Sequence, residues 1–246
     1  MQTHCFGQSP DAAQTKNMTF LLSNDDGIDA LGIAAMADAL TQLGHTAPVF
    51  IAPDREQSGC GHRVTTRTPI AVETRDDRHH AISGTPADCV RLGLHALCPE
   101  ASWVLSGINA GGNMGVDIYL SGTLAAVREG AMHGVPGIGI SQYLNWQKPM
   151  NWEKTTAMAV RVLAALLDRG CERGTYWNVN LPHLDDGAPE PELVFCQSST
   201  SPLLLDYRVA AEGYQYQGNY QMREALPGTD VATCFAGNIA IVKLSL

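Results

Sequence analysis

Apolar runs alternate with amphipathic stretches from residue 18 to about residue 170, which is the pattern of a parallel β-sheet with crossover helices. Short apolar runs predict buried strands at residues 18–23, 48–52, 102–107 and 135–141. Apolar side chains at helical spacing predict helices at residues 33–43, 88–98, 124–134 and 152–170. This part of the chain is therefore expected to form a doubly wound, mostly parallel α/β sheet.

The stretch between the second strand and the second helix is more polar. Gly59 and Gly61 mark a polar loop, and "RTPIAVET" at 67–74 is predicted to be extended. The charged run "RDDRHH" predicts a surface loop that carries His79 and His80.

The pattern changes near residue 176. From there, strands are predicted at 176–182, 192–197, 207–220 and 238–246, without helices of comparable length between them. We therefore expect a flexible extension at 1–17 and one α/β domain at 18–246, of which 176–246 is a β-rich C-terminal part. Hairpins that their own chain covers poorly often pack on a neighbouring subunit, so a homo-oligomer is expected.

Composition narrows the function classes. The formal net charge is -9 and no long Lys/Arg run offsets it, which argues against nucleic-acid binding. No stretch approaches the roughly 18 consecutive apolar residues of a membrane helix, and residues 1–17 lack the apolar core of a signal peptide. The seven cysteines are scattered and form no C-x-x-C pair, so we expect reduced thiols in the cytoplasm.

Two adjacent carboxylates, Asp25 and Asp26, follow the first predicted strand. Neighbouring carboxylates repel each other unless one is protonated or a cation lies between them. Ser58 and Asn109 stand in loops after two further strands, and such loops converge at the carboxyl edge of a parallel sheet. Together these side chains would present an all-oxygen shell that suits Mg²⁺, Mn²⁺ or Ca²⁺. The alternative is a solvated turn or a helix cap.

A second signal is the triplet Ser121, Gly122 and Thr123, which precedes a predicted helix. Free backbone N–H groups at a helix N-terminus favour an anion, and the two hydroxyls could add donors to a phosphate. The alternative is that Ser121 or Thr123 simply caps the helix.

Several known signatures are absent. The run "GGNMG" at 111–115 lacks G-x-G-x-x-G spacing, and the chain has no P-loop, G-x-S-x-G or H-E-x-x-H motif. The eight histidines show no ligand-like pairing on a helix face. Only His62, four residues after Ser58, is kept as a possible substrate contact.

Taken together, the motifs resemble those of the SurE family, stationary-phase survival proteins that act as metal-dependent nucleoside-monophosphate phosphatases. The resemblance rests on "LLSNDDGIDALGI", "APDREQSG", "ISGTPADCVRLGL", "SGINAGGNMG", "YLSGTLAAVREG", "NVNLP" and "PGTD" at 227–230. The chain departs from the family at Val116, where many relatives have an acidic residue beside Asp117, and over residues 184–226.

The resemblance implies a metal site and a phosphate site. One divalent ion per subunit, Mg²⁺ or Mn²⁺, would be bound by Asp25, Asp26, Ser58 and Asn109, with the two aspartates catalytic. The substrate phosphate would lie against Asn113 and the turn formed by Ser121, Gly122 and Thr123. The resemblance also implies a Rossmann-like core and a C-terminal hairpin exchanged within a homodimer, with tetramers built from such dimers.

These inferences predict hydrolysis of nucleoside 5′-monophosphates to nucleoside and inorganic phosphate by a metal-activated water. One alternative is a nucleotide sensor that uses the same metal loop without turnover. Another is a structural oligomer in which the aspartates only cap a helix. A sugar-nucleotide transferase is disfavoured because its aspartate pair separated by one residue is missing.

Overall fold

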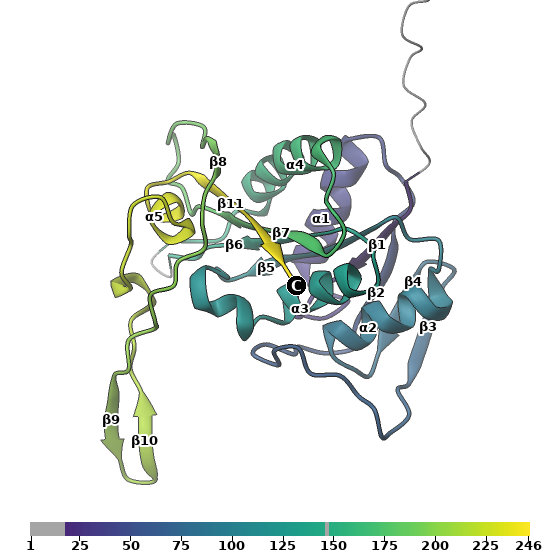
Figure 1. The fold of residues 1–246 in the computed structure, drawn as a ribbon, viewed down its shortest axis with the longest axis horizontal. Coiled ribbons are helices and arrows are strands. Elements are labelled where there is room, and N and C mark those ends of the chain that lie inside the picture. The colour runs from purple at the N-terminus through teal and green to yellow at the C-terminus, as the bar shows by residue number, and fades with distance from the viewer. Residues whose placement is uncertain (1–17, 146–147) are drawn as a thin grey trace, which may run out of the picture.

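A nine-stranded sheet forms the centre of the computed structural model, which describes residues 18–145 and 148–246 (Figure 1). Its strand order is β3-β4-β2-β1-β5-β6-β7-β11-β8, and the strands from β4 to β7 in this order are parallel. The strands of the first half are β1 Phe20–Ser23, β2 Val49–Pro53, β3 Val72–Asp76, β4 His79–Ile82, β5 Trp103–Ala110 and β6 Gly137–Gln142. This order matches doubly wound nucleotide-binding folds and confirms the predicted fold class.

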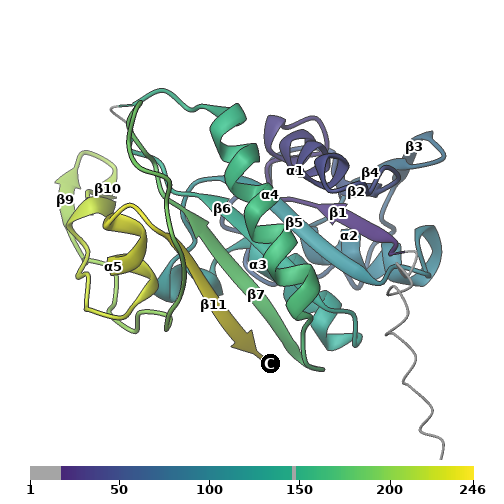
Figure 2. The ribbon, with the colours of Figure 1, turned by 90° about the horizontal axis from the view of Figure 1, so that it is seen from above.

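Two helices cover each face of the sheet. On one face α1 (Leu31–Gln42) packs beside α4 (Trp152–Arg169), as Figure 2 shows, and on the other α2 (Pro86–Leu92) packs beside α3 (Gly122–Met132). Strand β1 serves both layers: Leu22 belongs to the core under α1 and α4, and Leu21 to the core under α2 and α3. A strand buried on both faces must be apolar throughout, which explains the uninterrupted run that predicted it.

Polar residues mark the helix starts. Ser121 caps α3 and Asn151 caps α4 through their side chains. The second helix was expected to begin at Asp88, but it begins at Pro86 because Thr85 is its cap and Asp88 completes a capping box with Thr85. The helical stretch then continues as a π-helix, η1, over Gly93–Leu97.

The predicted loop at His79 and His80 is wrong, although the His79 side chain stays 36% exposed. Both begin β4, which pairs with β2, and His80 is buried with its Nδ1 3.1 Å from the hydroxyl of Thr74. The charged residues before this short strand, which pairs with both β3 and β2, had concealed it.

The C-terminal part is β-rich as predicted, but most of it completes the main sheet. Strand β7 (Thr175–Leu181) pairs with β6, and β11 (Ile239–Ser245) is antiparallel to β7 and carries the short β8 (Leu193–Phe195). The helix α5 (Asp230–Phe235) packs against β11.

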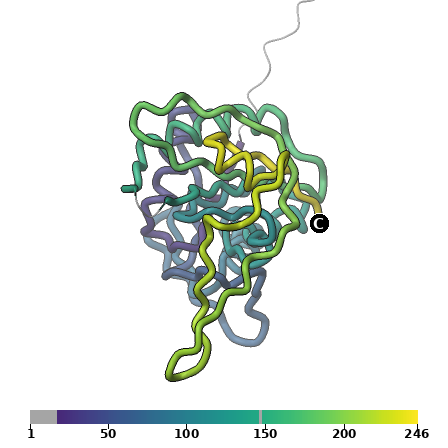
Figure 3. Tube along the Cα trace, turned by 90° about the vertical axis from the view of Figure 1, so that its left-hand side faces the viewer, coloured from purple at the N-terminus to yellow at the C-terminus, as the bar shows by residue number. Residues whose placement is uncertain are grey.

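A separate hairpin projects away from the body of the molecule (Figures 1 and 3). It consists of β9 (Tyr207–Ala210) and β10 (Gly213–Tyr216), and every residue of both strands is exposed. The predicted exchange of this hairpin between subunits stays a prediction. The expected extension at 1–17 lies outside the described residues. Within the described ranges, no helix combines the length and apolar character needed to cross a membrane.

Candidate active site

The candidate site lies where the crossovers of the parallel sheet change direction. Strands β1 and β5 are neighbours, but the chain leaves β1 toward α1 on one face and leaves β5 toward α3 on the other. Loops diverge at such a point and open a crevice at the carboxyl ends of the strands, where ligands of doubly wound folds bind. Asp25 and Asp26 follow β1, and Asn109 is the second-last residue of β5.

Asp25 joins three parts of the chain. Its carboxylate is buried and accepts a 2.5 Å hydrogen bond from the Thr123 hydroxyl at the start of α3. Its backbone carbonyl accepts from the N–H of Gln57, which fixes the loop that carries Ser58. Gly122 lies against the same carboxylate, because a Cβ at position 122 would come within 2.7 Å of the Asp25 Cβ.

Asp26 faces the end of β5. One of its carboxylate oxygens accepts a hydrogen bond of 3.3 Å from the backbone N–H of Ala110, directly after Asn109. The end of β5 that carries Asn109 therefore lies beside Asp26.

The two carboxylates carry negative charge without a compensating side chain. Burial raises the pKa of Asp25, against hydrogen bonds from Thr123 that lower it. Burial and the charge of Asp25 raise the pKa of Asp26 to about 6, and Glu56 adds to the negative potential. No Lys, Arg or His within residues 18–145 and 148–246 forms an ion pair with either carboxylate. A divalent cation would supply the missing positive charge, so the donor set fits a metal.

The two neutral candidate ligands differ in how they are held. The Asn109 side-chain amide nitrogen donates to the Gly111 carbonyl at 2.7 Å, so its amide oxygen is the atom suited to a cation. Ser58 is exposed and its hydroxyl donates to Glu56 at 2.7 Å. Glu56 was not among the site residues predicted from the sequence. Its position two residues before Ser58 was the only indication in the sequence that it lies near the site.

The side chains predicted to bind phosphate, Ser121 and Thr123, mainly form hydrogen bonds within the protein. The Ser121 hydroxyl accepts from the Leu124 N–H and caps α3, which is the alternative that the sequence left open. The Thr123 hydroxyl is directed to Asp25 rather than outward. The backbone N–H groups of the first turn of α3 still lie beside the carboxylate pair, since Gly122 touches Asp25.

Asn113 is a second scaffold residue. Its side-chain nitrogen donates to Ser141, and its backbone carbonyl accepts from the side chains of Asn178 and Asn180. The motif "NVNLP" thus holds the glycine-rich loop over β6 and β7, a role that its sequence alone did not suggest. Contact of Asn113 with a phosphate stays a prediction.

Comparison with known proteins decides the family. The family model described as Survival protein SurE matches residues 20–201. The chain belongs to the SurE family. It is 51% identical to "Putative 5'-nucleotidase alr3139" of Nostoc sp. over 92% of this chain and 99% of that protein. It is 38% identical to the 5′-nucleotidase SurE of Geobacter sulfurreducens over 93% of this chain and 88% of that one.

A solved SurE structure has the same fold. The crystal structure of the SurE protein from Aquifex aeolicus superposes with a TM-score of 0.80 at 32% identity, and the match covers 92% of this chain and 93% of that one. The Rossmann-like α/β fold that the motifs implied for this SurE chain is therefore confirmed.

His62 lies beside α3 in this SurE chain. Its Nε2 is 2.7 Å from the carboxylate of Glu129, which also contacts His133 at 2.9 Å and Arg91 at 3.2 Å. Burial would raise the pKa of Glu129, but the hydrogen bonds of His62 and His133 and the nearby positive charge hold it below its usual value. His62 therefore anchors the loop that carries Ser58, while its predicted substrate contact stays untested.

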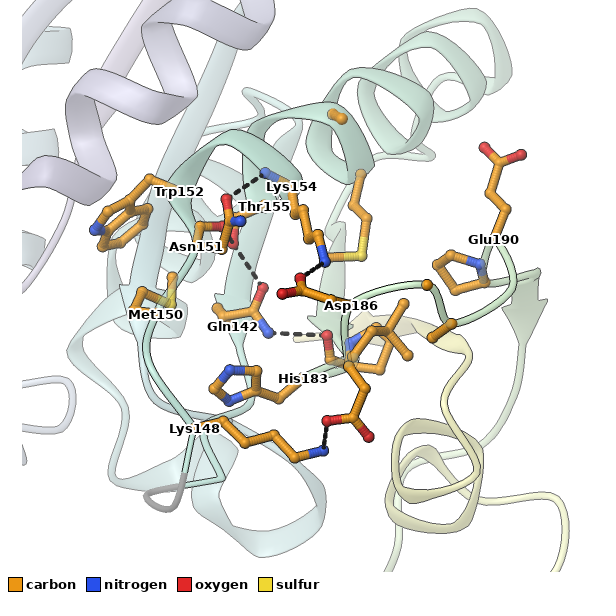
Figure 4. Close-up of a pocket in the computed structure, with 18 of the residues that line it drawn as sticks. Gln142, Lys148, Met150, Asn151, Trp152, Lys154, Thr155, His183, Asp186 and Glu190 are labelled. Atoms are coloured by element: carbon orange, nitrogen blue, oxygen red, sulfur yellow. Dashed lines mark hydrogen bonds and ion pairs between the residues drawn. The ribbon is translucent and has the colours of Figure 1, made fainter.

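A separate cavity of about 590 Å³ lies between the start of α4 and residues 182–191 (Figure 4). None of the predicted site residues lines it. Gln142 at its base donates to three backbone carbonyls and accepts from Thr155, and Lys154 at its rim is paired with Asp186. Because these polar groups bind one another and the lining cations Lys148, Lys154 and Arg161 are paired with Asp185, Asp186 and Glu190, the cavity does not resemble a phosphate site.

Proposed function

We propose that this SurE protein is a metal-dependent phosphatase that hydrolyses nucleoside 5′-monophosphates to nucleoside and inorganic phosphate. The names of its relatives support the nucleotidase activity. The observation that carries the proposal is the pair of buried Asp25 and half-buried Asp26: within residues 18–145 and 148–246 no cationic side chain forms an ion pair with either carboxylate, and Asp25 lies against the amino end of α3.

One Mg²⁺ or Mn²⁺ ion would be held by Asp25, Asp26, Ser58 and Asn109. Two carboxylates and two neutral oxygens form a hard donor set that neutralises the ion without repelling a phosphate. When bound, such an ion withdraws charge from a phosphoryl oxygen and lowers the pKa of water beside it.

The chain itself would bind and orient the phosphate. Backbone N–H groups around Gly122 and Thr123 stand at the positive end of the α3 dipole and would face the phosphoryl oxygens, with Ser121 and Asn113 at the margin. The Thr123 hydroxyl holds the Asp25 carboxylate in one orientation at the start of α3, and this would keep it in place for a bound phosphate.

We further propose a homodimer or tetramer that assembles through the β9–β10 hairpin, in the cytoplasm. The exposed strands of the hairpin support the first point. None of the six cysteines in the described ranges forms a disulfide, which agrees with a reducing compartment.

The test is phosphate release from a panel of nucleoside 5′-monophosphates and p-nitrophenyl phosphate, with Mn²⁺, Mg²⁺ or EDTA. Asp25→Asn should reduce the metal-dependent rate at least about 100-fold, since it removes a charged ligand. Asp29→Asn makes the same change at an exposed site paired with Arg75 and should leave the rate within about twofold.

Two outcomes would contradict the phosphatase. If nucleotides bind but no metal produces turnover, the protein is a nucleotide sensor. If neither binding nor turnover occurs and Asp25→Asn changes only thermal stability, the aspartates are structural.

A further inference from the structure

The glycine-rich loop over residues 111–117 has little stiffness of its own. Gly111, Gly112 and Gly115 lack a Cβ, and Gly115 has a φ of +57°, so the backbone has access to many conformations. Yet the loop continues directly from Asn109 and contains Asn113, two residues that the proposed site needs in fixed positions. Other parts of the chain must therefore hold it.

Two residues of the C-terminal part form hydrogen bonds with this loop. The Tyr220 hydroxyl lies 3.2 Å from the Gly112 carbonyl and 2.8 Å from Asp117. Arg223 donates from one guanidinium nitrogen to the same Asp117 oxygen at 2.6 Å and from the other to the Met114 carbonyl at 3.1 Å. We refer to Asp117, Tyr220 and Arg223 as the loop clamp.

The clamp is buried and closely fitted. Arg223 is 6% exposed and Asp117 9% exposed, and the guanidinium lies 4.7 Å from the centre of the Tyr220 ring. A Cβ at position 112 would come 3.0 Å from the Tyr220 hydroxyl, and one at position 115 would come 3.3 Å from the Arg223 guanidinium. Glycine at positions 112 and 115 therefore lets Tyr220 and Arg223 approach closely, although at position 115 the Ser199 carbonyl, 2.9 Å from such a Cβ, is the nearer obstacle.

The arrangement requires arginine rather than any cation. Its planar fork reaches a carboxylate and a backbone carbonyl with two separate nitrogens, whereas the single ammonium of a lysine is a point charge. The hydrogen bonds that the Tyr220 and Arg223 side chains make to Gly112, Met114 and Asp117 all lie within residues 111–117. The clamp therefore acts on the loop rather than on the core of the sheet.

We propose that Arg223, with Tyr220, is a positioning residue for the active site. It holds the glycine-rich loop so that Asn109 and Asn113 stand ready for the ion and the phosphate, and this role rests on the proposed function. Because the clamp follows the hairpin at 207–216 by only a few residues, it also ties the projecting arm to the site.

The test compares Arg223→Met, Arg223→Lys and Tyr220→Phe with Val162→Ala. Val162 is fully buried in the α4 layer, so its truncation lowers the melting temperature without touching the loop. Arg223→Met should raise the Mn²⁺ concentration for half-maximal activity about tenfold and lower kcat/KM by a similar factor, as loss of a ligand-supporting residue does. Arg223→Lys and Tyr220→Phe should show smaller changes in the same direction.

Mn²⁺ binding by calorimetry and amide hydrogen exchange over 111–117 complete the test. In Arg223→Met the loop amides should exchange at least about tenfold faster than in Val162→Ala. If Arg223→Met does not fold, Tyr220→Phe provides the same comparison with one hydroxyl removed.

Two results would overturn the proposal. One is unchanged loop exchange. The other is a Mn²⁺ requirement no different from that of Val162→Ala at an equal melting temperature. A wild type that releases no phosphate would refute the proposed function instead, and loop exchange would still decide the clamp.

Discussion

At the scale of single residues, Gly122 is the tightest constraint on the carboxylate pair. Alanine there would improve helix propensity, yet its methyl group would lie 2.7 Å from the Asp25 Cβ and 3.0 Å from a carboxylate oxygen. Asp25 must then move, and a displacement of about 1 Å in a reacting group can cost about 100-fold in rate. Gly122→Ala should therefore reduce metal-dependent phosphate release at least about tenfold.

A matched control is Gly139→Ala on β6, where the added methyl group meets Leu124 and Val127 at an ordinary 3.5 Å. This variant should keep its activity within about threefold while its melting temperature changes little. Equal activity of Gly122→Ala and wild type would show that Asp25 is not held in place by this contact.

Site residues that are neighbours in the sequence could be predicted from the sequence. Asp25 and Asp26 stand together at a strand end, so their juxtaposition needs no tertiary information. The supports of the site were not predictable, because they come from distant parts of the chain. Asp230 of "PGTD", for example, accepts the Gly115 N–H across 115 positions.

At the scale of elements, α3 connects the site to the loop of residues 54–63 through Glu129. This carboxylate is 3% exposed and takes hydrogen bonds from His62, His133 and Arg91. Glu129→Gln leaves those groups without their charged partner. Since Arg91 and His133 are half exposed, we expect a loss of about 1–3 kcal/mol rather than the larger cost of a fully buried pair.

The pKa of Glu129 is lowered by folding, so its stabilising effect is complete above the unfolded value of about 4.5 and is lost as the pH falls through the lower folded value. Urea unfolding should thus show the full difference between wild type and Glu129→Gln at about pH 5, and a shrinking one in stronger acid. A difference that grows below about pH 4.5 would contradict this assignment.

Element prediction succeeded where one periodicity governed the whole segment. Strand β1 and helix α4 lie where the apolar pattern places them, because burial on both faces or on one stripe dictates their composition. It failed at His79 and His80, where pairing with β2 decides the strand against a charged local sequence. The pattern also could not show that β7 and β11 join the main sheet.

At the scale of the whole molecule, the β9–β10 hairpin stands out because every residue of its two strands is exposed. Tyr207 and Val209 alternate along one strand and stand opposite Tyr216 and Tyr214 on the other, so they share one face. Val209 and Tyr214 are each 78% exposed. An isolated two-stranded hairpin is marginal in water, and an apolar face of this kind is usually covered by another surface.

A second copy of the chain is the partner that we propose for this face. The variant Val209→Asp/Tyr214→Asp places two repelling charges directly opposite each other on the hairpin and would also have to bury them in an interface. Light scattering should show wild type at twice or four times the 26.4 kDa chain mass, and this variant mainly as a monomer. Glu212→Lys at the hairpin turn changes charge without removing apolar surface and should keep the wild-type mass. A wild type that stays monomeric at all concentrations, or a double variant that keeps its assembly, would show that the hairpin face is not the interface.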